Sequence, residues 1–278
     1  VAITQDADDI GAAIARALAH MPLEALTRDR LVAIKPNDTY ATEDDQSGVT
    51  QGDTLRAVIH AVKQHAPGHV VVTGGAGAAE TDDVFRLSGM MAVIEEEDVE
   101  FFDHNRAPFR DVDLEYGVDV EVTGPQKSVK VNPRVLEYDT LIVLSQIKVH
   151  SMATITGALK NIAMSYPAAD HYGHPRGSYR RPHHFLDDLH SFIAAMCRRF
   201  PIDLAVTVGH PAMVAHGPLA GYAVETGLCI ASTDALAADT VQAALLGFEA
   251  QAVRHLWEAG KLGLGETELD RCTFPEMD

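Results

Sequence analysis

Apolar residues along this chain gather in short continuous runs rather than in strict alternation. The clearest runs are Leu31–Lys35, His69–Thr73, Thr140–Ser145 and Asp203–Val208. A continuous run of this kind is typical of a parallel strand that is buried on both faces of its sheet. Apolar residues recur at helical spacing in other segments, namely Asp9–Ala25, Thr50–Gln64, Phe185–Arg199, Asp234–Leu246 and Glu249–Ala259. The sequence therefore predicts an α/β fold with a mainly parallel sheet flanked by helices.

A different pattern interrupts this order in the middle of the chain. Three short strand-like segments follow one another at Val99–Phe102, Val118–Thr123 and Ser128–Val131. They leave no room for the helices that connect parallel neighbours, so we predict an antiparallel β-hairpin region around 99–131. It would be inserted at about 95–135 into a single α/β domain of residues 1–278, with two intimate lobes as the alternative organisation. A further strand is expected at Gly221–Ser232.

The junction after the third apolar run is the strongest candidate for chemistry. The run breaks at Lys148 and His150, and a helical pattern then resumes with Lys160 and Asn161. In open α/β sheets, ligands bind at the carboxyl ends of strands. From Lys148 to Arg181 there are five Lys or Arg residues and one acid, whereas the whole chain has a formal net charge of -18. We expect Lys148 and Lys160 to hold an anion and His150 to act as acid, base or metal ligand, although lysines in loops are ordinarily solvated.

Other strand-end loops carry further candidates for ligand binding. They are Lys35, Asn37, Gly74, Gly75, Gly77, His216 and Gly217. Glycines before a helix permit close backbone approach, and the free N–H groups of the helix start favour a phosphate or carboxylate. A plain tight turn explains the same glycines equally well. Asp234 is most simply the N-cap of the following helix.

Five of the fourteen histidines fall between His171 and His190. On a helix, His184 and Asp188 would share a face, so with His150 they are candidate ligands for a divalent transition metal. The alternative is a polar lid over residues 167–182. In that case its arginines, Arg176, Arg180 and Arg181, would close over an anionic ligand.

Four segments carry a resemblance to a known family. They are IKPN at 34–37, QIKVHSMATITGALKN at 146–161, GPLAG at 217–221 and STDALAADTVQAALLGF at 232–248. In this order, within residues 31–270, they resemble the prokaryotic domain of unknown function 362. The resemblance implies little about the reaction. Relatives often carry a ferredoxin-like iron–sulfur module, which suggests an iron–sulfur protein as a partner. Family members usually have a lysine-rich strand end. This chain departs from that pattern at Gln146 and Val149.

Composition limits the remaining classes. The three cysteines lie more than thirty residues apart, so no intrinsic iron–sulfur cluster is expected. The acidic charge argues against a nucleic-acid surface, and no apolar run is long enough to cross a membrane. The acidic N-terminal stretch is unlike a signal peptide, so we expect a cytoplasmic protein. The chain begins at Val1, which leaves a removed leader open, and the sequence does not indicate an oligomeric state.

Two functions are consistent with these observations. The first is an enzyme that acts on a small carboxylated or phosphorylated molecule through a Lys/His pocket at the strand ends, with metal assistance as an option. The second is a non-catalytic ligand-binding or accessory protein that docks to a separate iron–sulfur redox protein. Eleven acids between Glu95 and Glu121 would then form the docking face. A solvated surface is the simpler interpretation of those acids.

Overall fold

The central feature of the computed structural model is a nine-stranded mixed sheet, in a structure that describes residues 1–117, 127–173, 188–218 and 220–275. The strands run in the order β1-β11-β9-β7-β2-β3-β4, and β10 and β8 pair with β9 and β7. Their bounds are β1 Ala2–Gln5, β2 Leu31–Pro36, β3 His69–Gly74, β4 Glu100–Asp103, β7 Thr140–His150, β8 Thr154–Ile155, β9 Leu204–Val214, β10 Tyr222–Val224 and β11 Leu228–Ser232. The five strands from β9 to β4 are parallel, and β11 and β1 continue the sheet antiparallel. The predicted fold class is confirmed.

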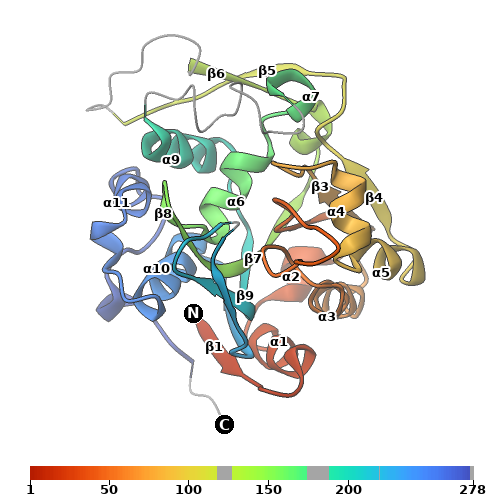
Figure 1. The fold of residues 1–278 in the computed structure, drawn as a ribbon, viewed down its shortest axis with the longest axis horizontal. Helices are drawn as coiled ribbons and strands as arrows, with labels where there is room; N and C mark the ends of the chain where they lie inside the picture. Colours follow the sequence, from red (N-terminus) through yellow and green to blue (C-terminus); the bar gives the residue numbers. More distant parts are fainter. Residues whose placement is uncertain (118–126, 174–187, 219, 276–278) are drawn as a thin grey trace.

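Helices cover both faces of this sheet (Figure 1). On one side lie α1 Ile10–Leu18, α2 Leu23–Thr27, α3 Gly52–Lys63, α4 Thr81–Leu87 and α5 Met90–Glu96. On the other side lie α6 Gly157–Ser165, α9 Leu189–Arg199, α10 Ala235–Leu245 and α11 Arg254–Lys261, with the short α7 Ala169–Tyr172 nearby. Short 3-10 turns occur at Pro133–Leu136, Ala250–Ala252 and Leu269–Arg271.

Alternation along the strands divides the interior into two hydrophobic cores. In β2, Ala33 belongs to the core under α6, α9 and α10, whereas Val32 and Ile34 belong to the core under α1 and α3. This two-sided burial follows from the period of two along a strand, and it explains why the sequence shows continuous rather than alternating apolar runs.

The inserted region differs from the prediction in two strands. β5 Arg110–Asp113 and β6 Ser128–Val131 form a separate antiparallel sheet, so the predicted strand at Ser128–Val131 is present, but its partner β5 was not predicted. The segment predicted at Val99–Phe102 instead forms β4, which pairs parallel to β3 at the edge of the main sheet. The helices α4 and α5 supply the crossover connection that a parallel pair requires. The predicted strand at Val118–Thr123 lies outside the described residues.

Two other boundaries also differ. β7 does not stop at Ser145 but continues to His150, because its second half still pairs with β9 and β8. The segment expected as one strand at Gly221–Ser232 forms β10 and β11, with Gly227 at a positive φ of 60° between them. None of the helices in the described parts of the chain is long and apolar enough to cross a membrane.

Candidate functional site

The carboxyl ends of β2 and β7 bring five polar side chains together inside the protein. We call Lys35, Asn37, Asp38, Lys148 and Asn161 the strand-end cluster. Each of them is at most 5% exposed, and both lysines are fully buried. Charged groups with this burial need internal partners, because water cannot solvate them. Four of the five were predicted from the sequence, and Asp38 was not.

Asp38 holds one half of this cluster. Its Oδ1 accepts a hydrogen bond from Lys35 Nζ at 2.8 Å, and its Oδ2 accepts from the backbone N–H of Gly75 at 2.6 Å. Lys35 Nζ also donates to Pro36 O at 2.5 Å and to Asn161 Oδ1 at 3.4 Å. The carboxylate of Asp38 therefore connects the end of β2 to the end of β3, and Lys35 connects both to α6.

Lys148 forms the other half. Its Nζ donates to Asn37 Oδ1 at 3.0 Å and to Gly48 O at 2.7 Å. Burial lowers the pKa of Lys148 to about 7, although the negative charge of Asp38 opposes that shift. A lysine with this pKa exchanges its proton near neutral pH, whereas a solvated lysine stays protonated.

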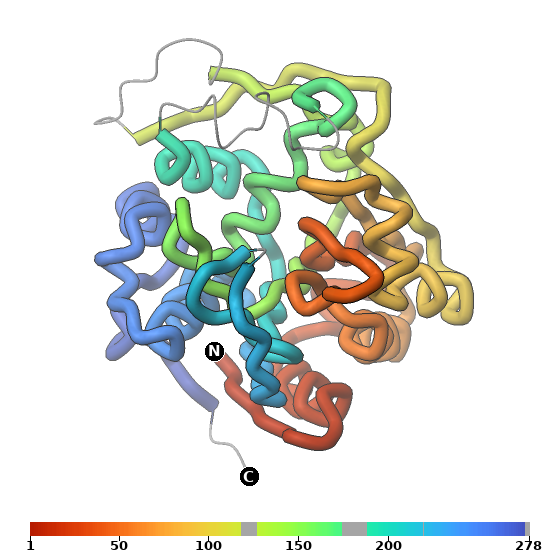
Figure 2. Tube along the Cα trace, viewed as in Figure 1, coloured from red at the N-terminus to blue at the C-terminus, as the bar shows by residue number. Residues whose placement is uncertain are grey.

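The loop between β2 and α3, residues 37–51, covers these side chains. Gln146 Nε2 donates to Ser47 O at 2.9 Å and to Pro211 O at 3.1 Å. Gln146 and Lys148 are two positions apart on β7, so both side chains reach the loop from the same face of the sheet. In Figure 2 this orange connection lies beside the blue β9–β10 region, where Gly48 approaches Met213 and Pro218. The strand-end cluster is therefore closed on this side by the protein's own backbone.

A second layer of hydrogen bonds fixes Gly75. Ser165 Oγ donates to Gly75 O at 3.0 Å, and His104 Nε2 lies 3.0 Å from the same Oγ. Because the hydroxyl proton is used on Gly75, we assign the Nε2 proton to His104. His104 Nδ1 then accepts from Thr73 Oγ1 at 2.8 Å. These residues show no local sequence pattern, so sequence reasoning missed them.

The glycines after β3 serve close packing. A Cβ on Gly75 would lie 2.0 Å from His104 Nε2, and one on Gly74 would lie 2.7 Å from the Phe85 ring. Gly77 lies in a partly buried bend. The helix that follows, α4, carries Asp82 and Asp83 in its first turn. Those charges disfavour an anion at this helix start, so the tight-turn interpretation fits Gly74 and Gly75 better.

The hydrogen bonds of His150 and the electrostatic effect of Lys160 involve residues outside the strand-end cluster. His150 Nδ1 accepts the backbone N–H groups of Met152 at 3.1 Å and Ala153 at 3.2 Å, which occupies the nitrogen that would serve as a base. Lys160 is buried on α6, and its charge contributes to lowering the pKa of His190 and His255 on other helices. Lys148 and Lys160 thus have different surroundings, and their joint binding of one anion stays a prediction.

Two further candidates, His216 and Gly217, lie in the loop after β9. His216 is exposed. Gly217 is buried, a Cβ there would lie 2.0 Å from Val149 O, and its carbonyl accepts from the Ser151 N–H at 3.0 Å. Gly217 therefore packs the loop after β9 against the end of β7. The predicted lid arginines, Arg176, Arg180 and Arg181, lie outside the described residues.

The N-terminus of α6 faces a buried carboxylate of the protein itself. Asp239 accepts the backbone N–H of Ala158 at 2.7 Å and of Leu159 at 3.0 Å. Burial raises the pKa of Asp239 to about 7 in spite of these two hydrogen bonds. An external anion would bind most favourably to the backbone N–H groups at the start of α6, and these groups already donate to Asp239. Asp234 caps α10 as predicted, accepting from the Ala237 N–H at 2.9 Å.

The family model described as domain of unknown function (DUF362) matches residues 32–244. The chain belongs to this family. No curated protein is similar enough to match it. Among solved structures, the crystal structure of a Thermotoga maritima protein is similar, with 14% identity and a TM-score of 0.49. That match covers 87% of this chain and 59% of the Thermotoga protein.

In this DUF362 chain, metal binding stays a prediction. Asp188 is the N-cap of α9, accepts from Ser191 N–H at 3.2 Å and is paired with Arg254, so its oxygens are engaged. Among the described residues, no three His, Cys, Asp or Glu side chains are placed to hold an ion. His184 lies outside the described residues.

Proposed function

We propose that this DUF362 protein is an enzyme that binds a small carboxylated or phosphorylated molecule at the carboxyl ends of β2, β3 and β7. The observation that carries the proposal is Lys148. It is a fully buried lysine whose pKa is lowered to about 7, placed where α/β sheets bind ligands. Such an amine takes up and releases a proton at neutral pH, which general acid–base catalysis requires.

Each member of the strand-end cluster has a distinct role in this proposal. Lys35 supplies a fixed positive charge, because Asp38 holds it at 2.8 Å. Lys148 exchanges the proton. Asn37 and Asn161 orient the two ammonium groups through their amide oxygens. With both lysines protonated and Asp38 ionised, the cluster has a net positive charge, which would attract a carboxylate or phosphate.

Entry of the ligand requires the loop 37–51 to move. At present Gly48 O and Asn37 Oδ1 accept the hydrogen bonds of Lys148. Oxygen atoms of a ligand would take these two positions, with little change in the number of hydrogen bonds. Loops of this length without regular structure are commonly functional covers in compact domains.

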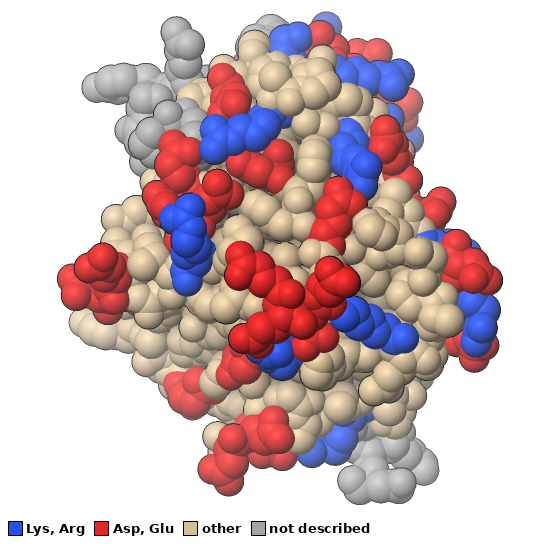
Figure 3. Space-filling model, turned by 90° about the vertical axis from the view of Figure 1, so that its right-hand side faces the viewer, with Lys and Arg blue, Asp and Glu red and all other residues tan. Residues whose placement is uncertain are grey.

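The alternative function, docking to an iron–sulfur redox protein, has weaker support. Most described acids between Glu95 and Glu115 are in ion pairs with bases of the same chain, namely Arg56, His60, Lys63, His69, Arg106, Lys130, Arg134 and Arg198. Figure 3 shows basic side chains beside the acidic ones on this face. A surface whose charges are largely neutralised internally attracts a basic partner less strongly.

A ligand screen with matched variants tests the proposal. Small carboxylates and phosphates are added to the wild type, to Lys148→Met and to the surface variant Lys63→Met, and binding is followed by thermal shift and calorimetry. At least one compound should bind the wild type and Lys63→Met equally. Lys148→Met should bind it roughly tenfold or more weakly, since a hydrogen bond to a charged group is lost. Conversion of that compound, followed by NMR, should depend on Lys148 in the same way. Equal binding by all three proteins would contradict the proposal.

A further inference from the structure

A second buried group of nitrogen-bearing side chains lies where α6, α9 and α11 pack together. It consists of Lys160 from α6, His190 from α9 and His255 from α11, and we call it the imidazole cluster. α9 packs against both of the other helices. The two imidazole rings are stacked, with centroids 5.8 Å apart and planes inclined by 22°.

His255 is the unusual member of this cluster. Its side chain is 0% exposed, and among the described residues neither Nδ1 nor Nε2 has a hydrogen-bond partner. His190 Nδ1 is also buried and lacks a partner in this part of the chain. Burying a polar group without a partner is costly, so a native protein rarely retains one without a reason.

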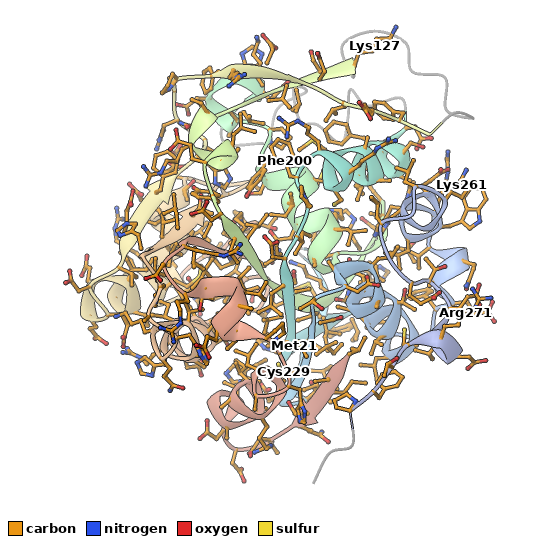
Figure 4. All side chains as sticks on the ribbon, turned by 180° about the vertical axis from the view of Figure 1, so that it is seen from behind. Met21, Lys127, Phe200, Cys229, Lys261 and Arg271 are labelled. Atoms are coloured by element: carbon orange, nitrogen blue, oxygen red, sulfur yellow. The ribbon has the colours of Figure 1, made fainter. Side chains whose placement is uncertain are left out.

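The pattern of exposed and buried residues along α11 shows that His255 faces inward. Arg254, Trp257 and Lys261 occupy the outer side, where the Lys261 ammonium lies 3.8 Å from the centroid of the Trp257 ring. Figure 4 shows Lys261 at the edge of the molecule. His255 and Glu258 are on the buried side of the same helix.

Two of the described acids near this cluster, Asp188 and Glu258, have partners on other side chains. Asp188 caps α9 and pairs with Arg254. Glu258 pairs with Lys261 at 3.0 Å and with Arg254 at 3.8 Å. The charge that acts on His255 from its surroundings comes from His190 and Lys160. The cluster therefore combines three nitrogen-bearing side chains, and the positive charge of Lys160 acts on both rings.

This environment suits an anion better than a metal ion. Two nearly parallel stacked rings cannot both direct an in-plane nitrogen lone pair at one ion with good geometry. Lys160 would also repel a cation. An oxyanion gains from both features, because ammonium and imidazole N–H groups donate from three different helices.

We propose that the imidazole cluster binds a tetrahedral oxyanion, the phosphate or sulfate group of a small molecule. The site is separate from the strand-end cluster, because Lys160 and Asn161 are consecutive on α6 and their side chains leave the helix in different directions. The proposal for the imidazole cluster does not depend on a catalytic role of Lys148.

Binding of the anion should be linked to proton uptake. Burial and the charge of Lys160 lower the pKa of both rings, that of His255 to about 3. The other charged groups that act on His190 are Arg254 on α11, which lowers its pKa, and Asp188 and Glu258, which raise it. A bound dianion would raise the pKa of both rings, so its affinity should fall as the pH rises.

Sulfate is the probe of choice, because its charge does not change between pH 5.5 and pH 8. Protein labelled at histidine ¹³Cε1 is titrated with sulfate at both pH values and, in parallel, with inorganic phosphate. The signals of His190 and His255 should move in a saturable way towards the imidazolium position, with tighter binding at pH 5.5. His255→Gln and Lys160→Met should each weaken binding roughly tenfold or more.

Control variants make the outcome decisive. His20→Gln removes an exposed histidine and should leave the affinity unchanged. In Lys148→Met the sulfate-dependent shifts of the His190 and His255 signals should persist, which separates this site from the proposed enzyme site. If His255→Gln does not fold, His190→Gln provides the same comparison. The inference is overturned if sulfate shifts the exposed histidines equally, if binding does not saturate, or if the cluster variants bind as the wild type does.

Discussion

Two buried clusters lie on different sides of helix α6 and differ in whether their polar atoms have hydrogen-bond partners. In the strand-end cluster, Lys35, Asp38 and Lys148 all form hydrogen bonds to groups of the protein. In the imidazole cluster, both ring nitrogens of His255 lack a partner among the described residues. The first arrangement stabilises the fold and must open before it can act on a ligand. The second costs stability until something binds to it.

The largest effect is expected from removing the charge that the strand-end cluster depends on. Asp38→Asn leaves the fully buried Lys35 without its counter-ion, and this should lower the free energy of unfolding by about 3–5 kcal/mol. Urea unfolding measures the change. The exposed pair of Glu24 and Arg28 is the control, because Glu24→Gln should cost no more than about 1 kcal/mol. Similar losses for the two variants would show that the buried pair does not hold the loop ends together.

The pH dependence of stability offers a second test of this cluster. The folded-state pKa of Lys148 is about 7, below that of an unfolded lysine at about 10.4. Between these values the unfolded chain binds the extra proton, so raising the pH favours the folded state. The stability of the wild type relative to Lys148→Met should therefore rise by about 4 kcal/mol from pH 7 to pH 10.5. A constant difference would mean that Lys148 titrates normally.

A steric substitution tests the layer that supports Asp38. Gly75→Ala would place a Cβ 2.0 Å from His104 Nε2, so the backbone that donates to Asp38 must shift. We expect a loss of about 1–3 kcal/mol in the free energy of unfolding. In the His104→Ala background the same substitution should cost clearly less, because the closest contact is removed and only Ser165 Oγ at 2.8 Å remains. If Gly75→Ala lowers the free energy of unfolding equally in both backgrounds, the loss does not come from the contact with the His104 imidazole.

The smallest expected effect has the opposite sign. His255→Leu replaces a buried imidazole that has no described partner with an apolar side chain of similar size. It should raise the free energy of unfolding by about 1 kcal/mol, since no hydrogen bond is lost and the desolvation cost disappears. The matched substitution Lys148→Leu should destabilise the protein above pH 8, because Gly48 O loses its donor. A loss of stability in His255→Leu would indicate a partner for the ring and weaken the contrast between the clusters.

The sequence predicted the sheet and part of the strand-end cluster for physical reasons that can be named. Parallel strands that are buried on both faces are continuously apolar, so β2, β3, β7 and β9 could be located. Their carboxyl ends share one edge of the sheet, which brings Lys35, Asn37 and Lys148 together. The grouping of Lys148 with Lys160 stays a prediction, and the structure gives the two lysines different surroundings. Consecutive helix positions point about 100° apart, so Lys160 leaves α6 in a different direction from Asn161, which belongs to the strand-end cluster.

Other parts of the site could not be predicted from the sequence. His104, Thr73 and Ser165 come from three different elements, and their contacts depend on how α6 packs on the sheet. Nothing in the spacing of these residues indicates the contacts. β4 could not be told from a hairpin strand, because its four residues are all partly exposed at the sheet edge.

The most direct measurement is an NMR titration of the lysine side chains in the ligand-free protein, with Lys148→Met to assign the signal. If the strand-end cluster works through a lysine that exchanges its proton, one lysine Nζ should titrate near pH 7, and that signal should be missing in Lys148→Met. If every lysine, including Lys148, titrates above pH 10, the amine is permanently charged, and the proposed acid–base role of the strand-end cluster is contradicted.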